Sequence, residues 1–453
     1  MTIFAYGAPA LGLGYMYLLM ALYVLYFSTN VLLIAPAVMG AVFAASRIFD
    51  AISDPVVGYL SDRTGARLGR RRSWLLGGIV PAAAAFLMVF SSPMDLAGYG
   101  LIAWMTVAII GFYAVATMIF VPHLSLGAEL SIDYHERSKL YGVRHGCYTL
   151  GSIAALGSMY VFTTSGELET AELRALVVSH ALFAGLALAV LVLFAVFKLR
   201  ERPEFQGRAA ESPFAAFRDV WGNAHARLLI LVTFIEHIGS AAIGVLTLFI
   251  TEYVVGAPEM AALVILCYMV PSTVLVPIWA PLSRRYSKKM MWLCSMMLTA
   301  LSFGGMILLM FIDTVDARLW TIGVLAFTAG IAAGCGGTIS PSIQSDVIDF
   351  DEHETGERKE GTYFAAWNFV YKGAYGVMLL LTGFVLDLSG FVPKVEQTET
   401  VKWAMITLYG ALPLVCYLIG AWLFSKFRFN EAEHAEIRAE LERRAMMQVQ
   451  AQQ

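Results

Sequence analysis

Apolar runs long enough to cross a lipid bilayer recur along this chain, from near the first residue to about residue 427. Each run approaches the roughly 20 residues that a helix needs to cross the hydrocarbon layer. Hydrophobic residues make up 58% of the 453 residues and charged residues only 14%, a composition that does not fit a surface in water. The sequence therefore predicts an all-α, multi-pass membrane protein rather than a soluble enzyme.

Twelve spans are predicted, in two groups of six that are separated by a polar stretch. We expect an N-terminal bundle at 1–197, a cytoplasmic linker with a short amphipathic helix at 198–225, a C-terminal bundle at 226–427 and a solvated cytoplasmic tail at 428–453. The predicted spans are 8–33, 35–60, 74–93, 99–127, 140–164, 176–197, 226–254, 259–282, 290–312, 317–345, 361–387 and 401–426.

Basic residues gather in alternate loops, which predicts that both termini lie in the cytoplasm. The two halves also echo each other, since LSDRTGARLGRRRSWLL at 60–76 follows the second span and LSRRYSKKMMWL at 282–293 follows the eighth. Two related bundles with a substrate site between them are typical of transporters built from parallel repeats. The five cysteines form no metal-binding pattern, and we expect no cofactor, no nucleic-acid partner and a monomer surrounded by membrane lipids.

The second span contains a group of charged residues that would be costly to bury without a function. Arg47, Asp50 and Asp54 recur at helical spacing and share one face, with Ser53 beside them. Two carboxylates one turn apart repel each other unless something positive lies between them. A hard monovalent cation held by oxygen atoms would satisfy both. In the alternative interpretation, Arg47 neutralises one aspartate and the other faces the cytoplasmic mouth.

Three further ionisable residues lie in or at the edge of spans. Lys372 needs an aspartate of the second span or an anionic substrate group as a partner, unless its ammonium reaches the membrane edge. Arg144 either holds a phosphate or carboxylate, or anchors its helix among the headgroups. Glu236 and His237 are adjacent: one of them changes its protonation during transport, or the two form a neutral pair where helices pack.

Two long segments resemble the signatures of a known family. RIFDAISDPVVGYLSDRTGARLGRRRSWLL at 47–76 and SDVIDFDEHETGERKEGTYFAAWNFVYK at 345–372 are similar to motifs of the glycoside-pentoside-hexuronide:cation symporters, a branch of the major facilitator superfamily. The resemblance implies the major facilitator fold, twelve transmembrane helices in two six-helix bundles, in the bacterial inner membrane. It also implies a symporter whose coupling ion, sodium, is bound by Asp50, Ser53, Asp54 and Thr117.

The resemblance also bears on the substrate. Sugar-transporting members of the family grip a galactoside with two aspartates and a tryptophan, and the matching positions here are Gly14, Phe120 and Leu124. A sugar needs buried hydrogen-bond partners, so we expect an apolar cavity instead. Other members carry lysophosphatidylcholine, and a lysophospholipid is the expected substrate. Lys372 and Arg144 would bind its headgroup and Phe120 and Leu124 its acyl chain.

Glu236 and Trp367 complete the predicted substrate site. The alternative is a cation-coupled symporter of a sugar, a glycoside or another small polar solute, with sodium or a proton as the coupling ion. Tyr15, Trp367 and Asn368 would then supply polar contacts.

Overall fold

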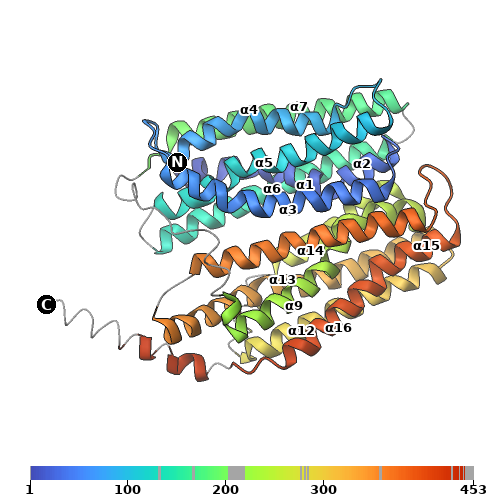
Figure 1. The fold of residues 1–453 in the computed structure, drawn as a ribbon. Coiled ribbons are helices and arrows are strands. Elements are labelled where there is room, and N and C mark those ends of the chain that lie inside the picture. The colour runs from blue at the N-terminus through green and yellow to red at the C-terminus, as the bar shows by residue number, and fades with distance from the viewer. Residues whose placement is uncertain are drawn as a thin grey trace. The chain divides into compact units, whose positions relative to one another are not determined.

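The protein is helical throughout the part of the chain that the structure describes (Figure 1). The computed structural model describes residues 2–130, 134–165, 169–201, 220–275, 278–279, 282, 285–356, 360–429, 432–437, 439–441 and 443. Ten helices within these ranges are long and apolar enough to cross a membrane. They confirm ten of the predicted spans. The span predicted at 140–164 lies in α6 (Tyr134–Thr164), and the span predicted at 259–282 corresponds in part to the shorter apolar helix α10 (Ala261–Val274).

Contacts divide the chain into two compact units. The first comprises Met1–Glu211, Gly244–Ala262 and Tyr375–Met405, and the second comprises Ser212–Ile243, Leu263–Ala374 and Ile406–Gln453. Boundaries therefore fall inside α9 (Ala224–Phe249), α10, α14 (Glu360–Leu388) and α15 (Glu399–Ile406). The expected halves at 1–197 and 226–427 stay a prediction. The amphipathic helix expected at 212–221 lies almost entirely outside the described residues.

The first unit contains the helices between Thr2 and Lys198. They are α1 (Thr2–Leu22), α2 (Val24–Asn30), α3 (Pro36–Arg63), α4 (Arg70–Phe90), α5 (Gly98–Leu130), α6 and α7 (Thr170–Lys198). The unit also takes in η2 (Ile250–Val255), η3 (Pro258–Met260) and most of α15 (Glu399–Ile406).

Two glycines let α1 and α6 pack backbone against backbone. A Cβ atom at Gly14 would overlap the carbonyl group of Tyr148, and one at Gly151 would overlap that of Leu11. Small residues permit this approach, which is a common way for helices to associate in a membrane, where no hydrophobic force drives them together.

The second unit is built around buried aromatic side chains. Trp292, Tyr363, Trp367 and Phe424 belong to one apolar cluster, and each is at most 2% exposed. Besides α10 and the first parts of α9 and α14, the unit contains α12 (Lys288–Gly305), η4 (Met306–Phe311), α13 (Val315–Thr355), η5 (Thr407–Ala411) and α16 (Leu412–Ser425).

The helix α13 is longer than a bilayer requires. Its 41 residues rise about 60 Å, roughly twice the thickness of the hydrocarbon layer. The predicted span ends at residue 345, and the helix continues for ten more residues to Thr355. This extension carries Asp346 and Asp349.

Residues beyond α16 return to this extension of α13. The imidazole of His434 lies 3.0 Å from an oxygen of Asp349 and 3.7 Å from one of Asp346, and Ile437 packs against the apolar cluster. The tail was expected to be a solvated appendage. At least its first residues are instead held against the second unit, because they include an apolar side chain and a hydrogen-bonding imidazole.

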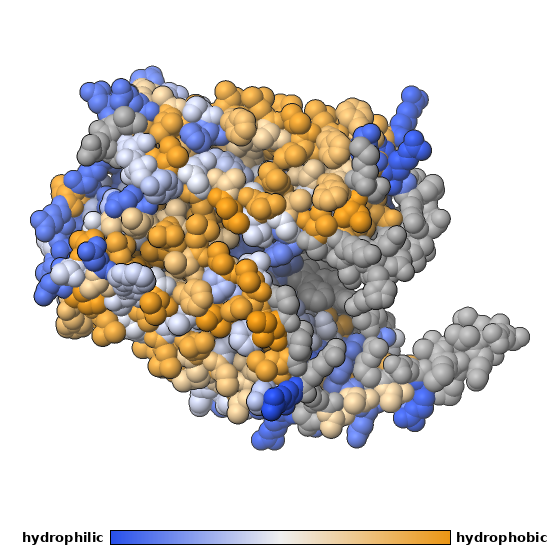
Figure 2. All heavy atoms as spheres, turned by 180° about the vertical axis from the view of Figure 1, so that it is seen from behind, coloured by the Kyte–Doolittle hydropathy of each residue, from blue (hydrophilic) through white to orange (hydrophobic). Residues whose placement is uncertain are grey.

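Apolar side chains cover broad areas of the face in Figure 2. Exposed large residues on single helices include Leu182, Phe183, Leu186 and Val190 of α7, which are each at least 50% exposed. Monomers in water rarely expose contiguous apolar surface on this scale. The surface is therefore one that faces lipid, as the composition predicts.

Candidate functional site

Two carboxylates of α3 meet one hydroxyl group of α5. The Thr117 hydroxyl lies 3.2 Å from an oxygen of Asp50 and 3.1 Å from an oxygen of Asp54. Asp50 and Thr117 are each 1% exposed, and Asp54 is half-buried. The predicted cation ligands Asp50, Asp54 and Thr117 are thus brought together, because the two aspartates are one helical turn apart on the face of α3 that meets α5.

The Thr117 hydroxyl has too few hydrogen atoms for its neighbours. A third acceptor, the backbone oxygen of Tyr113, lies 2.9 Å from it, yet a hydroxyl group donates one hydrogen bond at a time. Ser53 donates its own hydrogen to the backbone oxygen of Asp50 over 3.1 Å, which leaves its oxygen lone pairs as acceptors. Three oxygen atoms therefore compete for the one hydrogen of Thr117, and such an oxygen-rich arrangement is of the kind that binds a hard cation.

Arg47 balances only part of the negative charge. Its guanidinium lies 3.7 Å from Asp50 and stacks on the ring of Tyr113, 3.3 Å from the ring centroid. It pairs with one aspartate, as the alternative interpretation expected. With both carboxylates ionised, Arg47, Asp50 and Asp54 still sum to one negative charge, which a single monovalent cation would neutralise.

Aromatic rings connect this cluster to Arg144. Tyr17 of α1 lies 6.1 Å from Tyr113 and 5.8 Å from Phe120, measured between ring centroids. The guanidinium carbon of Arg144, on α6, lies 5.2 Å from the centroid of Phe120. Ring contacts and cation–π contacts thus run without a gap from Arg47 through three aromatic side chains to Arg144. Tyr17 and Tyr113 were not singled out from the sequence, because tyrosine in an apolar span is usually a packing residue.

Arg144 presents buried hydrogen-bond donors that have no acceptor. Among the described residues, its Nε and Nη2 atoms are buried and make no hydrogen bond. A guanidinium is planar and suited to holding phosphate or carboxylate with two hydrogen bonds, so these two atoms are available to an anionic group. Leu124 follows Phe120 by one turn of α5 and is 37% exposed.

Gly14 has a role in packing. A side chain at this position would meet the backbone of α6, so Gly14 faces a helix contact. Its lack of a carboxylate therefore does not support an apolar substrate, contrary to the reasoning from the sequence. Phe120 and Leu124 are the positions on which that reasoning now depends.

The other predicted residues lie in the second unit. Glu236 is 6% exposed, has Trp292 as its hydrogen-bond neighbour and packs near Gly420 of α16. His237 lies 2.8 Å from the carbonyl oxygen of Thr233 and against the ring of Tyr371. Glu236 and His237 thus contact different neighbours where helices pack, and a role for either in transport stays a prediction. Trp367 is 1% exposed within the apolar cluster, and Lys372 is half-buried on α14.

Comparison with known proteins gives a match over nearly the whole chain. Residues 5–431 match the family described as MFS/sugar transport protein. The inner membrane symporter YicJ of Escherichia coli (strain K12) is 26% identical over 90% of this chain and 86% of its own length. The sodium-dependent lysophosphatidylcholine symporter 1 of Xenopus tropicalis is 23% identical over 90% of this chain and 83% of its own length.

Solved structures support the fold. A crystal structure of a D-xylose-proton symporter superimposes with a TM-score of 0.66, covering 94% of this chain and 98% of that chain at 14% identity. The likeness is one of architecture, because so low an identity carries no information about the substrate.

Proposed function

The chain belongs to the glycoside-pentoside-hexuronide:cation symporters of the major facilitator superfamily, and from that membership we propose that it is a sodium-coupled symporter of lysophospholipids. It is a multi-pass membrane transporter and not an enzyme, and its transport is coupled to a cation. We further propose the bacterial inner membrane as its location, with both termini in the cytoplasm.

Sodium as the coupling ion rests on one observation. The Thr117 hydroxyl lies within hydrogen-bonding distance of both Asp50 and Asp54, in a cluster that is rich in oxygen atoms and carries one negative charge when both carboxylates are ionised. Sodium is a hard monovalent cation that takes oxygen ligands, so it matches both the donor set and the charge. Ser53 would be the fourth ligand.

The proposal that the substrate is a lysophospholipid rests on the surroundings of Arg144. Its two buried donors suit a phosphate, while Phe120 and Leu124 suit an acyl chain. Lys372 is the proposed second contact of the headgroup, and Glu236 and Trp367 are proposed substrate-binding residues. Sodium binding would weaken the attraction between Arg47 and Asp50, and the rings of Tyr113, Tyr17 and Phe120 would transmit the change toward Arg144, which supplies a coupling free energy.

Uptake into proteoliposomes tests the proposal. Radiolabelled lysophosphatidylcholine is offered with an inward sodium gradient, with potassium in its place, and with a proton gradient alone. Accumulation that requires sodium supports the proposal. Accumulation driven equally well by the proton gradient would show that sodium is not the coupling ion.

A sugar or another small polar solute is the second candidate. This candidate is supported by the matching family, whose description names sugar transport. It is also supported by a pair of hydroxyl groups suited to polar contacts, in which Tyr15 donates a hydrogen bond to Ser158 over 2.7 Å. A labelled galactoside offered to the same proteoliposomes separates the two candidates. Sodium-driven accumulation of the galactoside, with none of the lysolipid, would place the protein among the sugar carriers.

A further inference from the structure

A cavity of about 560 Å³ lies in the second unit where α12 begins and α16 ends. Its polar lining includes Lys288, Lys289 and Arg428, and its apolar lining includes Ile343, Phe427 and Phe429. The volume is in the range of small-molecule sites in proteins. None of these residues belongs to the proposed transport site.

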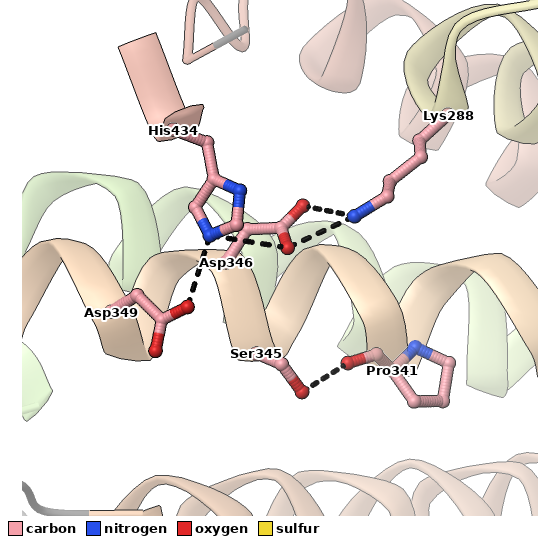
Figure 3. Close-up of polar contacts among 6 residues, drawn as sticks. All are labelled: Lys288, Pro341, Ser345, Asp346, Asp349 and His434. Carbon is pink, nitrogen blue, oxygen red and sulfur yellow. Dashed lines mark hydrogen bonds and ion pairs between the residues drawn. The ribbon is translucent and has the colours of Figure 1, made fainter. Parts of the chain in front are cut away.

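The two lysines of the cavity are held in place by hydrogen bonds with the protein. Lys288 donates to both oxygens of Asp346, over 2.9 and 2.6 Å, and His434 approaches Asp346 and Asp349 from the tail (Figure 3). Lys289 donates to the carbonyl oxygens of Ser425 and Phe427, over 2.8 and 2.6 Å.

Positive charge prevails at the cavity. The two anchored ammonium groups keep their charge while giving up little conformational freedom, and Arg428 is exposed at the rim. Asp346 is the acidic residue among those described in the lining, so the basic side chains exceed the acidic ones by two.

The cavity adjoins surfaces that face lipid. Met290, the residue after Lys289, is 56% exposed, and Trp422 near the end of α16 is 60% exposed. The ammonium of Lys426 lies 3.4 Å from the centroid of a Trp422 ring, a combination typical of the boundary between hydrocarbon and headgroups. The cavity is therefore at the level where a phospholipid places its phosphate.

We propose that this cavity binds the headgroup of an anionic phospholipid from the surrounding bilayer, with the acyl chains lying along α12 and α16. The lipid is a bound partner of the protein and not its transported substrate. Basic pockets at the membrane surface bind anionic headgroups in this way.

Native mass spectrometry of the detergent-solubilised full chain tests the proposal. Phosphatidylglycerol and phosphatidylcholine of the same acyl chains are titrated separately, and inorganic phosphate is titrated in a third arm. We expect phosphatidylglycerol to remain bound at lower concentration than either of the others. Equal retention of phosphatidylcholine, or binding of inorganic phosphate as tight as that of phosphatidylglycerol, would overturn the lipid assignment.

Two matched variants locate the site. Arg428→Gln removes a charge from the cavity, whereas Lys426→Gln removes the same charge two residues away, outside the cavity lining. We expect Arg428→Gln to weaken phosphatidylglycerol binding about fivefold, and Lys426→Gln to leave it nearly unchanged. Equal weakening by the two variants would show that the whole basic surface attracts the lipid and would refute this cavity as its site. Arg428→Lys should restore most of the binding.

Discussion

At the scale of single residues, the Thr117 hydroxyl is the point at which α3 and α5 share a polar contact. It lies among acceptors that exceed its one hydrogen, and Ser53 uses its own hydrogen elsewhere. A cation bound here would contact the oxygens of Asp50, Asp54 and Thr117 together, so replacing any one of these ligands should weaken sodium binding.

Replacing Asp54 by Asn keeps the size of the side chain and removes one negative charge. Arg47 then neutralises Asp50 alone, and the attraction for a cation is lost. At a sodium concentration a hundred times the dissociation constant, binding should add about 2.7 kcal/mol to the free energy of unfolding of the wild-type protein. We therefore expect sodium to raise the melting temperature of the wild-type protein and to leave that of Asp54→Asn unchanged. Sodium-stimulated uptake should disappear together with this shift.

Asp50→Asn and Thr117→Val should behave in the same way, and Thr117→Ser, which retains the hydroxyl, should bind sodium. An Asp54→Asn protein that is correctly inserted and still stabilised by sodium would show that the ion binds elsewhere.

The proposed substrate makes a prediction about acyl-chain length. Each buried CH₂ group contributes roughly 0.8 kcal/mol, so the affinity for lysophospholipids should rise along a chain-length series. Lys372→Ala and Arg144→Gln should weaken every member by a similar factor, because these side chains contact the headgroup alone. Competition binding in sodium measures both trends. A flat series in the wild-type protein would contradict an acyl-chain site, as would displacement by low concentrations of galactoside.

At the scale of elements, the beginning of α4 depends on a residue more than a hundred positions away. One oxygen of Glu201 accepts hydrogen bonds from the backbone N–H groups of Arg71 and Arg72, over 2.9 and 2.7 Å. The first N–H groups of a helix have no partner within the helix, and the positive end of its dipole favours a carboxylate. Gly69 leaves room for this carboxylate and adopts a φ of +105°, which a side chain would disfavour.

Glu201→Ala should therefore destabilise the protein by about 1 kcal/mol, the usual loss for a helix cap, as measured by thermal unfolding in detergent. Glu201→Gln keeps an oxygen acceptor and should lose less. Substrate affinity should stay nearly intact in both variants, because Glu201 caps a helix. It should also stay nearly intact when Arg70, Arg71 and Arg72 are replaced by Gln, because these basic residues help to set the orientation of the protein in the membrane. A large loss of affinity in a folded Glu201→Ala protein would contradict a purely structural role.

The sequence was informative where a pattern is local. The apolar runs predicted twelve spans, of which ten are confirmed, and the spacing of Asp50 and Asp54 predicted that they share a face. Both predictions depend only on neighbours within one helix. The position of Gly14 against α6, the cap from Glu201 and the chain of rings through Tyr17 all depend on contacts between distant segments. Periodicity within one helix carries no information about such contacts.

At the scale of the whole molecule, the segment that follows α16 contacts α13 through His434, and we expect this contact to stabilise the protein. His434 contacts Asp349, and Asp346 is shared between His434 and Lys288. If this contact holds the tail in place, His434→Ala and Asp349→Asn should each lower the melting temperature, and the double variant should lose less than the sum of the two. A coupling of about 1 kcal/mol is expected in this double-mutant cycle. Strict additivity would mean that the contact is not formed in solution.

The glycine contact between α1 and α6 has a mechanical consequence for the transport cycle. Where the backbones of two helices touch, no side chain lies between them to change its rotamer. We therefore expect α1 and α6 to move together as one rigid body. Tyr17 is on α1 and Arg144 is on α6. The distance between these two residues should therefore stay constant during the transport cycle. Spin labels placed on α1 and α6 should report the same separation with and without sodium. A bound substrate would then meet α1 and α6 as one moving surface.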